Sequence, residues 1–141
     1  MKNLVLVVDD DRDIRDSLIE MLEDHGYPAT GAANGAEALE ALRTRPRPSL
    51  ILLDLMMPVM DGRGFREEQL KNPAWADIPV IVISAYGNIE AQAQELAVGF
   101  VRKPVASRPL IELVRRYAGT PGPPGATGGP APPGAPGAAT D

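Results

Sequence analysis

The sequence contains no cysteine and only one histidine, His25, among its 141 residues. A disulfide framework is therefore excluded, as is a zinc site built from thiolates or from several imidazoles. Basic residues are also scarce, with 14 Lys and Arg against 19 Asp and Glu and a formal net charge of -5. This balance argues against a nucleic-acid partner, because phosphates are bound by a basic surface.

Long hydrophobic runs are missing as well. The apolar run near the amino terminus, Leu4–Val8, is far too short for the apolar region of a signal peptide or for a membrane span. We therefore expect a cytoplasmic protein with no membrane partner.

Glycine and proline are unevenly distributed along the chain. From Gly119 onward the residues are almost all Gly, Pro, Ala and Thr, which bury too little apolar surface to offset the entropy of ordering. We predict one folded domain over residues 1–118 and a disordered tail over residues 119–141. Glycine recurs at every third position from 119 to 128, as in collagen, but Ala131 interrupts the series. This break favours a low-complexity tail that samples polyproline II over a triple helix.

Short aliphatic runs without polar alternation are typical of strands buried on both faces of a parallel sheet. Such runs are Leu4–Val8, Ser49–Asp54 and Val80–Ser84, with weaker strands expected at Ala29–Ala33 and Gly99–Arg102.

Helical patterns alternate with these strands. The first follows Asp11 or Asp13 as a cap, carries Ile14, Leu18, Met21 and Leu22 on one face and stops at Gly26. The others are Ala36–Leu42, a helix marked by Phe65 and Leu70, Ile89–Ala97, and a helix marked by Leu110, Leu113, Val114 and Tyr117. The alternation predicts an α/β fold, a doubly wound five-stranded parallel sheet with five helices on its two faces.

Polar residues stand at the carboxyl ends of four predicted strands, where doubly wound folds bind their ligands. Asp9 and Asp10 follow the first strand, Asp54 ends the third, Ser84 ends the fourth and Lys103 follows the fifth. Converging carboxylates repel one another, and a magnesium ion would relieve the repulsion because it prefers oxygen ligands. A lysine and a serine beside them suit the oxygens of a transferring phosphoryl group. The set therefore predicts phosphoryl transfer to a carboxylate acceptor.

Each residue has a structural alternative when it is taken alone. Asp9–Asp11 suit the cap of the first helix, Ser84 suits a loop hydroxyl and Lys103 suits a solvated surface charge. Asp54 is harder to explain in this way, because a lone carboxylate that ends an apolar strand is costly without a partner. The occurrence of such residues at successive strand ends favours one common site.

Four motifs resemble the receiver domain of response regulators in two-component signalling. The resemblance covers about residues 3–118 and implies the flavodoxin-like fold of that family, which agrees with the sheet predicted above. The motifs are Val7-Val8-Asp9-Asp10, Leu52-Leu53-Asp54-Leu55-Met56-Met57-Pro58-Val59-Met60-Asp61-Gly62, Ile83-Ser84-Ala85 and Arg102-Lys103-Pro104.

The resemblance implies an acceptor and a metal site. Asp54 matches the aspartate that accepts a phosphoryl group from a histidine kinase or a phosphotransfer protein. Asp10, Asp54 and the backbone carbonyl of Met56 match the magnesium ligands. Asp9 matches an acidic residue that holds the metal, often through water.

The resemblance also implies a switch. Ser84 matches the hydroxyl residue that binds the phosphoryl group and moves on activation, and Lys103 matches the lysine that pairs with that group, usually before a cis proline. Phe100 falls at the position of the switch aromatic. Phosphorylation of Asp54 would draw Ser84 inward and admit the Phe100 ring to the vacated space. This would change the surface of the fourth helix, fifth strand and fifth helix, which binds a downstream protein target.

One feature departs from the family pattern. Ser84 and Lys103 are 19 positions apart. This is about three residues fewer than is usual, or close to one helical turn. The Gly-Ala pair that usually precedes the fifth strand is missing, since Leu96-Ala97-Val98 runs directly into Gly99-Phe100.

We expect a stand-alone, phosphorylation-controlled binding module without a DNA-binding output. One alternative is an aspartate-nucleophile phosphohydrolase, but such enzymes need an acid near the nucleophile, and here Leu55 and Met56 follow Asp54. The other alternative is a degenerate receiver that signals without phosphorylation. The shortened segment favours it, and the intact set of site residues argues against it.

The phosphoryl group on Asp54 is predicted to be long-lived. Two positions that tune its lifetime in this family fall on Met56 and Tyr86, two residues after Asp54 and Ser84. A thioether is a weak acceptor and the Tyr86 ring is bulky enough to cover the phosphoryl group, so neither orients an attacking water. Met56→Asn should speed the loss of the label after the donor is removed, and Tyr86→Glu should do the same. Decay of the wild type within seconds, unchanged by either substitution, would contradict this shielding.

Overall fold

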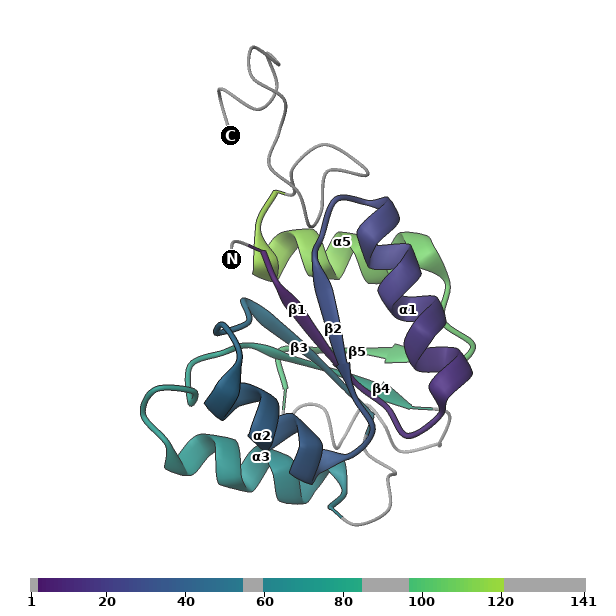
Figure 1. The fold of residues 1–141 in the computed structure, drawn as a ribbon. Helices are drawn as coiled ribbons and strands as arrows, with labels where there is room; N and C mark the ends of the chain where they lie inside the picture. Colours follow the sequence, from purple (N-terminus) through teal and green to yellow (C-terminus); the bar gives the residue numbers. More distant parts are fainter. Residues whose placement is uncertain (1–2, 55–59, 85–96, 121–141) are drawn as a thin grey trace.

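The computed structural model describes residues 3–54, 60–84 and 97–120. Within them, a parallel five-stranded sheet has the order β2-β1-β3-β4-β5 and carries helices on both faces (Figure 1). The predicted doubly wound α/β fold is confirmed. The expected fourth helix, Ile89–Ala97, lies outside the described residues except for Ala97. The strands are β1 Val5–Val8, β2 Ala29–Ala32, β3 Leu50–Asp54, β4 Val80–Ser84 and β5 Gly99–Arg102, and the helices are α1 Arg12–Asp24, α2 Gly35–Thr44, α3 Gly62–Lys71 and α5 Ser107–Ala118.

The sheet separates two hydrophobic cores, because successive side chains of a strand point to opposite faces. Val5 and Val7 of β1 pack in the core that contains α1 and α5, whereas Leu6 and Val8 pack in the core with α2 and α3. Figure 1 shows these two pairs of helices on opposite faces of the sheet. All residues of β1, β3 and β4 are buried, which explains their continuous aliphatic runs.

Polar residues before the helices act as N-caps. Asp11, and not Asp13, caps α1 and accepts hydrogen bonds from the backbone N–H groups of Asp13 and Ile14 at 2.9 and 3.1 Å. Asn34 caps α2 and Asp61 caps α3 in the same way. With Asn34 as its N-cap, α2 begins at Gly35, one residue before the predicted start. None of the helices in the described ranges is both long enough and apolar enough to cross a membrane.

The carboxyl end of α5 is hydrogen-bonded to residues that lie just before β1 and β2. The side chain of Asn3 donates to the carbonyl of Ala118, and the hydroxyl of the buried Tyr27 donates to the carbonyl of Gly119 at 2.7 Å. Gly119 has a φ of 89°, which favours glycine. Residues 121–141 of the predicted tail lie outside the described residues.

The buried face of α3 differs from the expectation in one residue. Phe65 is fully buried as expected, but Leu70 is 52% exposed and Gln69 takes the interior position. Gln69 is accommodated because its amide is hydrogen-bonded: Nε2 donates to the carbonyls of Trp75 and Ile78 at 2.8 and 3.1 Å, and Oε1 accepts from Arg66 at 2.8 Å. A buried polar side chain with such partners cannot be recognised from apolar periodicity.

Because Gln69 is buried and Leu70 is exposed, we expect substitutions at these neighbouring residues to differ in their effect on the free energy of unfolding. Gln69→Ala should lower the free energy of unfolding by about 2–3 kcal/mol, because the buried Ile78 carbonyl loses its side-chain donor and a cavity remains. Leu70→Ala should change it by less than about 0.5 kcal/mol, as for other exposed positions. Urea denaturation of the two variants measures the difference. A larger loss for Leu70→Ala than for Gln69→Ala would contradict the observed orientation of α3.

Candidate functional site

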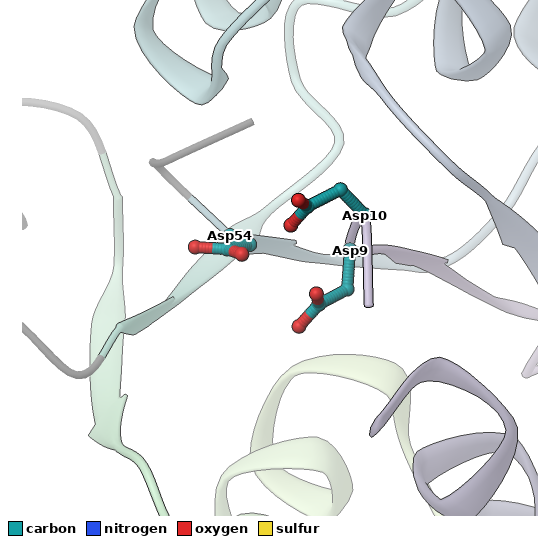
Figure 2. Close-up of side chains that lie close together, drawn as sticks. All are labelled: Asp9, Asp10 and Asp54. Carbon is teal, nitrogen blue, oxygen red and sulfur yellow. The ribbon is translucent and has the colours of Figure 1, made fainter. Parts of the chain in front are cut away.

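The carboxyl ends of the central strands bring the predicted polar residues together. Val8 of β1 pairs with Leu53 of β3, so the next residues, Asp9 and Asp54, lie side by side just beyond that pair. Ser84 is the last residue of β4, next to β3 in the sheet. Figure 2 shows Asp9 and Asp10, from the end of β1, together with Asp54 at this edge. The parallel arrangement alone explains why residues so far apart in the sequence meet.

The three aspartates form a compact carboxylate cluster. One oxygen from each of Asp9, Asp10 and Asp54 lies within 4.8 Å of the others. Asp9 and Asp54 are only 1% and 4% exposed, whereas Asp10 is exposed. The cluster is therefore buried on the side of the sheet and open to solvent on the side of Asp10.

Lys103 neutralises part of this cluster. Its Nζ lies 2.9 Å from Asp9 Oδ2 and 3.2 Å from Asp54 Oδ2, and the contact with Asp54 is a hydrogen bond. Burial alone would lower the pKa of Lys103, but its contacts with Asp9 and Asp54 outweigh burial and raise that pKa above its ordinary value. The ammonium is therefore charged at neutral pH. The structural alternative of a solvated Lys103 does not hold, since the side chain is only 16% exposed.

The backbone places Lys103 at this edge. Its N–H donates to the carbonyl of Ser84 at 3.0 Å, which extends the pairing of β4 and β5 by one residue. The peptide bond between Lys103 and Pro104 is cis, as the resemblance implies. Ser84 itself is 2% exposed.

Asp9 and Asp11 have different roles in the turn after β1. Asp9 Oδ1 accepts a hydrogen bond from the N–H of Asp11 at 2.9 Å, while the Asp11 side chain caps α1. The helix-cap alternative thus applies to Asp11 only. Asp9 and Asp10 are left to form the carboxylate cluster with Asp54.

The oxygen donors of the cluster fit a hard divalent cation. The cluster brings three carboxyl groups together beside one ammonium, so acidic groups outnumber the basic one. Among the described residues, the buried Oδ2 of Asp9 has the Lys103 ammonium at 2.9 Å as its partner. Carboxylates completed by water are the ligands that Mg²⁺ prefers. Met56, whose carbonyl is expected to complete the set, lies outside the described residues, as does Tyr86.

Phe100 lies apart from the cluster. It pairs with Val82 in the β4–β5 ladder, and its side chain is 36% exposed at the sheet edge. Val98 just before β5 is 46% exposed, and Arg102 is exposed as well. In the described residues, the outer strand β5 and the residue before it therefore expose both apolar and charged side chains.

The motif-based expectations do not include Arg15, which touches the site from α1. Its Nη1 donates to the backbone carbonyl of Asp9 at 2.8 Å, and the side chain is half-buried. The signal in the sequence is a charge on the apolar face of the helix, because Arg15 is three and seven residues from the buried Leu18 and Leu22.

The profile of the response regulator receiver domain matches residues 5–115. The chain therefore belongs to the response regulator receiver family of two-component signalling.

Two relatives match over most of their own length. An uncharacterized 14.6 kDa protein of Leptolyngbya boryana is 41% identical, over 80% of this chain and 88% of that protein. Protein Rrf1 of Nitratidesulfovibrio vulgaris is 35% identical, over 87% of this chain and 91% of that protein.

Solved structures show the same fold. A response regulator receiver protein from Pseudomonas putida has a TM-score of 0.76 and 33% identity, over 82% of this chain and 98% of that one. The Vibrio cholerae chemotaxis protein CheY4 also has a TM-score of 0.76, with 28% identity, over 83% and 99% of the two chains.

Other relatives are longer than the matched region. The chain covers only 46% of the probable transcriptional regulator ycf27 of Porphyra purpurea and 24% of a putative NtrX-like response regulator of Rickettsia bellii. In such relatives the receiver is one part of a larger protein.

Removal of the Lys103 charge should destabilise the fold in a pH-dependent way. Lys103→Met should lower the free energy of unfolding by about 1–3 kcal/mol at neutral pH, less than for a fully buried pair because the lysine is partly exposed. A raised lysine pKa stabilises the fold fully below the ordinary lysine pKa of about 10.5, and this contribution disappears as pH rises through the folded-state value. The difference from wild type should therefore be constant between about pH 7 and 9 and shrink above about pH 10.5.

The matched control is Lys71→Met, since Lys71 is one of the three lysines and its ion pair with Glu68 is exposed. Urea denaturation over this pH range should give little change for the control. Equal losses for the two variants would contradict a special role of the Lys103 charge.

Proposed function

We propose that this chain is a phosphoacceptor receiver in which Asp54 takes a phosphoryl group from a histidine kinase or a phosphotransfer protein. The observation that supports this most is the position of Lys103 Nζ, 2.9 Å from Asp9 and 3.2 Å from Asp54. A positive charge held beside a buried carboxylate is suited to bind the oxygens of an incoming phosphoryl group.

The proposed transfer is a substitution at phosphorus. A carboxylate oxygen of Asp54 attacks the phosphorus of a phosphohistidine, the new P–O bond forms as the P–N bond breaks, and the leaving imidazole takes the bonding electron pair and then a proton from solvent. Lys103 and Ser84 bind the oxygens of the transferred group. The product is an acyl phosphate on Asp54. Water attack at its phosphorus breaks the P–O bond to Asp54, which releases inorganic phosphate and returns the carboxylate.

The proposed metal ligands are Asp10, Asp54 and the carbonyl of Met56, with Asp9 acting through a water. A bound Mg²⁺ supplies positive charge that balances the transferring phosphoryl group. Asp10 is the exposed member of the cluster, so a donor and the ion reach the site from the same side.

The proposed output is a change in a protein-binding surface rather than turnover of a substrate. Ser84 and Phe100 lie on the adjacent strands β4 and β5, so a movement of Ser84 toward the phosphoryl group acts on the edge that carries Phe100. The proposed partners are the phosphoryl donor and a downstream protein target, and the proposed location is the cytoplasm.

The experiment is phosphorylation by acetyl phosphate with Mg²⁺, followed by intact mass. Wild type should gain one phosphoryl group, Asp54→Asn should gain none, and a chelator should prevent the gain. The control, Asp24→Asn, removes an exposed carboxylate at the end of α1 and should be labelled like wild type. Labelling of Asp54→Asn at a comparable rate would refute the assignment, and multiple turnovers of a small phosphate ester would instead indicate a phosphohydrolase.

A further inference from the structure

We infer that Arg15 is a positioning residue for the metal-binding carboxylates, and that Gly31 provides the space in which it acts. Arg15 holds the peptide between Asp9 and Asp10 and thereby places Asp10. This inference rests on the proposed function, because Asp10 is the proposed metal ligand.

The contact lies where the chain leaves the sheet. The N–H of Asp9 still donates to the carbonyl of Ala32 in β2 at 3.1 Å, but its carbonyl faces α1 and accepts from Arg15 Nη1 at 2.8 Å. Arg15 is half-buried in the second turn of α1, so its guanidinium is held between the helix and the end of β1. A charged donor makes this a stronger bond than one between neutral groups.

The planarity of the peptide transmits this contact to Asp10. The carbonyl of Asp9 and the nitrogen and Cα of Asp10 lie in one plane. A fixed carbonyl direction therefore fixes the position of the Asp10 Cα, from which the exposed carboxylate reaches the cluster. The side chain of Asp9 is held independently, by the N–H of Asp11 and by Lys103. Loss of the Arg15 bond should thus affect Asp10 more than Asp9.

Gly31 in β2 makes room for the Arg15 side chain. A Cβ at Gly31 would lie 2.9 Å from Arg15 Cδ, 3.2 Å from Arg15 Cγ and 3.2 Å from Ile19 Cδ1. The first distance is shorter than real Cβ atoms show, so the aliphatic part of Arg15 would have to move. An alanine at position 31 would therefore displace the stem of Arg15.

Arg15 could act on the carboxylates through its charge or by positioning Asp10. The two roles predict opposite changes in Mg²⁺ affinity when Arg15 is removed. If Arg15 acted only through its positive charge near the carboxylates, its removal would strengthen Mg²⁺ binding. If it positions Asp10, its removal weakens Mg²⁺ binding. Groups that orient metal ligands from outside the coordination shell change metal affinity by about 10- to 100-fold when they are removed.

The test measures the Mg²⁺ dissociation constant of the full chain by calorimetry and the rate of phosphorylation by acetyl phosphate as a function of Mg²⁺. Arg15→Met keeps the aliphatic stem but removes the donors, and it should raise the dissociation constant about tenfold. Saturating Mg²⁺ should restore most of its phosphorylation rate. Arg15→Lys keeps a charge and a donor and should recover part of the affinity.

The control is Arg12→Met, which removes the same charge from the same helix. The Arg12 side chain is 83% exposed and lies 3.7 Å from Asp16. Its Mg²⁺ affinity should be unchanged or slightly higher. A second variant, Gly31→Ala, leaves Arg15 in the sequence but displaces it and should weaken Mg²⁺ binding in the same direction as Arg15→Met.

The outcomes separate this inference from the proposed function. If wild type neither binds Mg²⁺ nor is phosphorylated, the proposed function fails, and the inference fails with it. If wild type does both and Arg15→Met binds Mg²⁺ as tightly as Arg12→Met, only the inference is overturned. If Arg15→Met does not fold, Gly31→Ala decides, and an unchanged affinity in that variant overturns the positioning role.

Discussion

The ion pairs of Lys103 with Asp9 and Asp54 are the interaction on which the rest of the site depends. Two nearly buried carboxylates at neighbouring strand ends repel each other, and an ammonium 2.9 and 3.2 Å away offsets that repulsion. The same lysine is tied to β4 through the carbonyl of Ser84. Lys103 therefore links the carboxylate cluster to the ends of β4 and β5.

The sheet explains why the carboxylate cluster and Lys103 can lie at its end without weakening the hydrophobic core. The residues of β1, β3 and β4 are buried on both faces, so stability comes from aliphatic packing along the strands. The polar residues of the site are confined to the last ladder pairs and the positions just beyond them. Substitutions at the exposed Asp10 should thus affect the proposed metal site with little effect on packing, whereas Asp9 and Asp54 are buried, so substitutions there should affect packing as well.

The sequence predicts the fold and the cluster well because both depend on short, local patterns. Unalternated aliphatic runs specify the buried strands, and Asp9, Asp54 and Lys103 meet because parallel strands align their carboxyl ends. Two features depend on tertiary contacts and escape such patterns. Gln69 is buried because carbonyls in the following turn accept from it. Arg15 reaches the carbonyl of Asp9 with its stem packed against Gly31, 16 residues further along the chain.

The hydrogen bonds of Asn3 and Tyr27 hold the carboxyl end of α5 beside the amino ends of β1 and β2. Asn3 and Asp9 lie beyond opposite ends of β1, whose four residues span about 13 Å at the usual rise of a strand. Ala118 and Gly119 therefore lie at the end of the sheet opposite the carboxylates. The carboxyl end of α5 thus leaves the carboxylate cluster uncovered, and the proposed phosphoryl donor would approach Asp54 from the other end of the sheet.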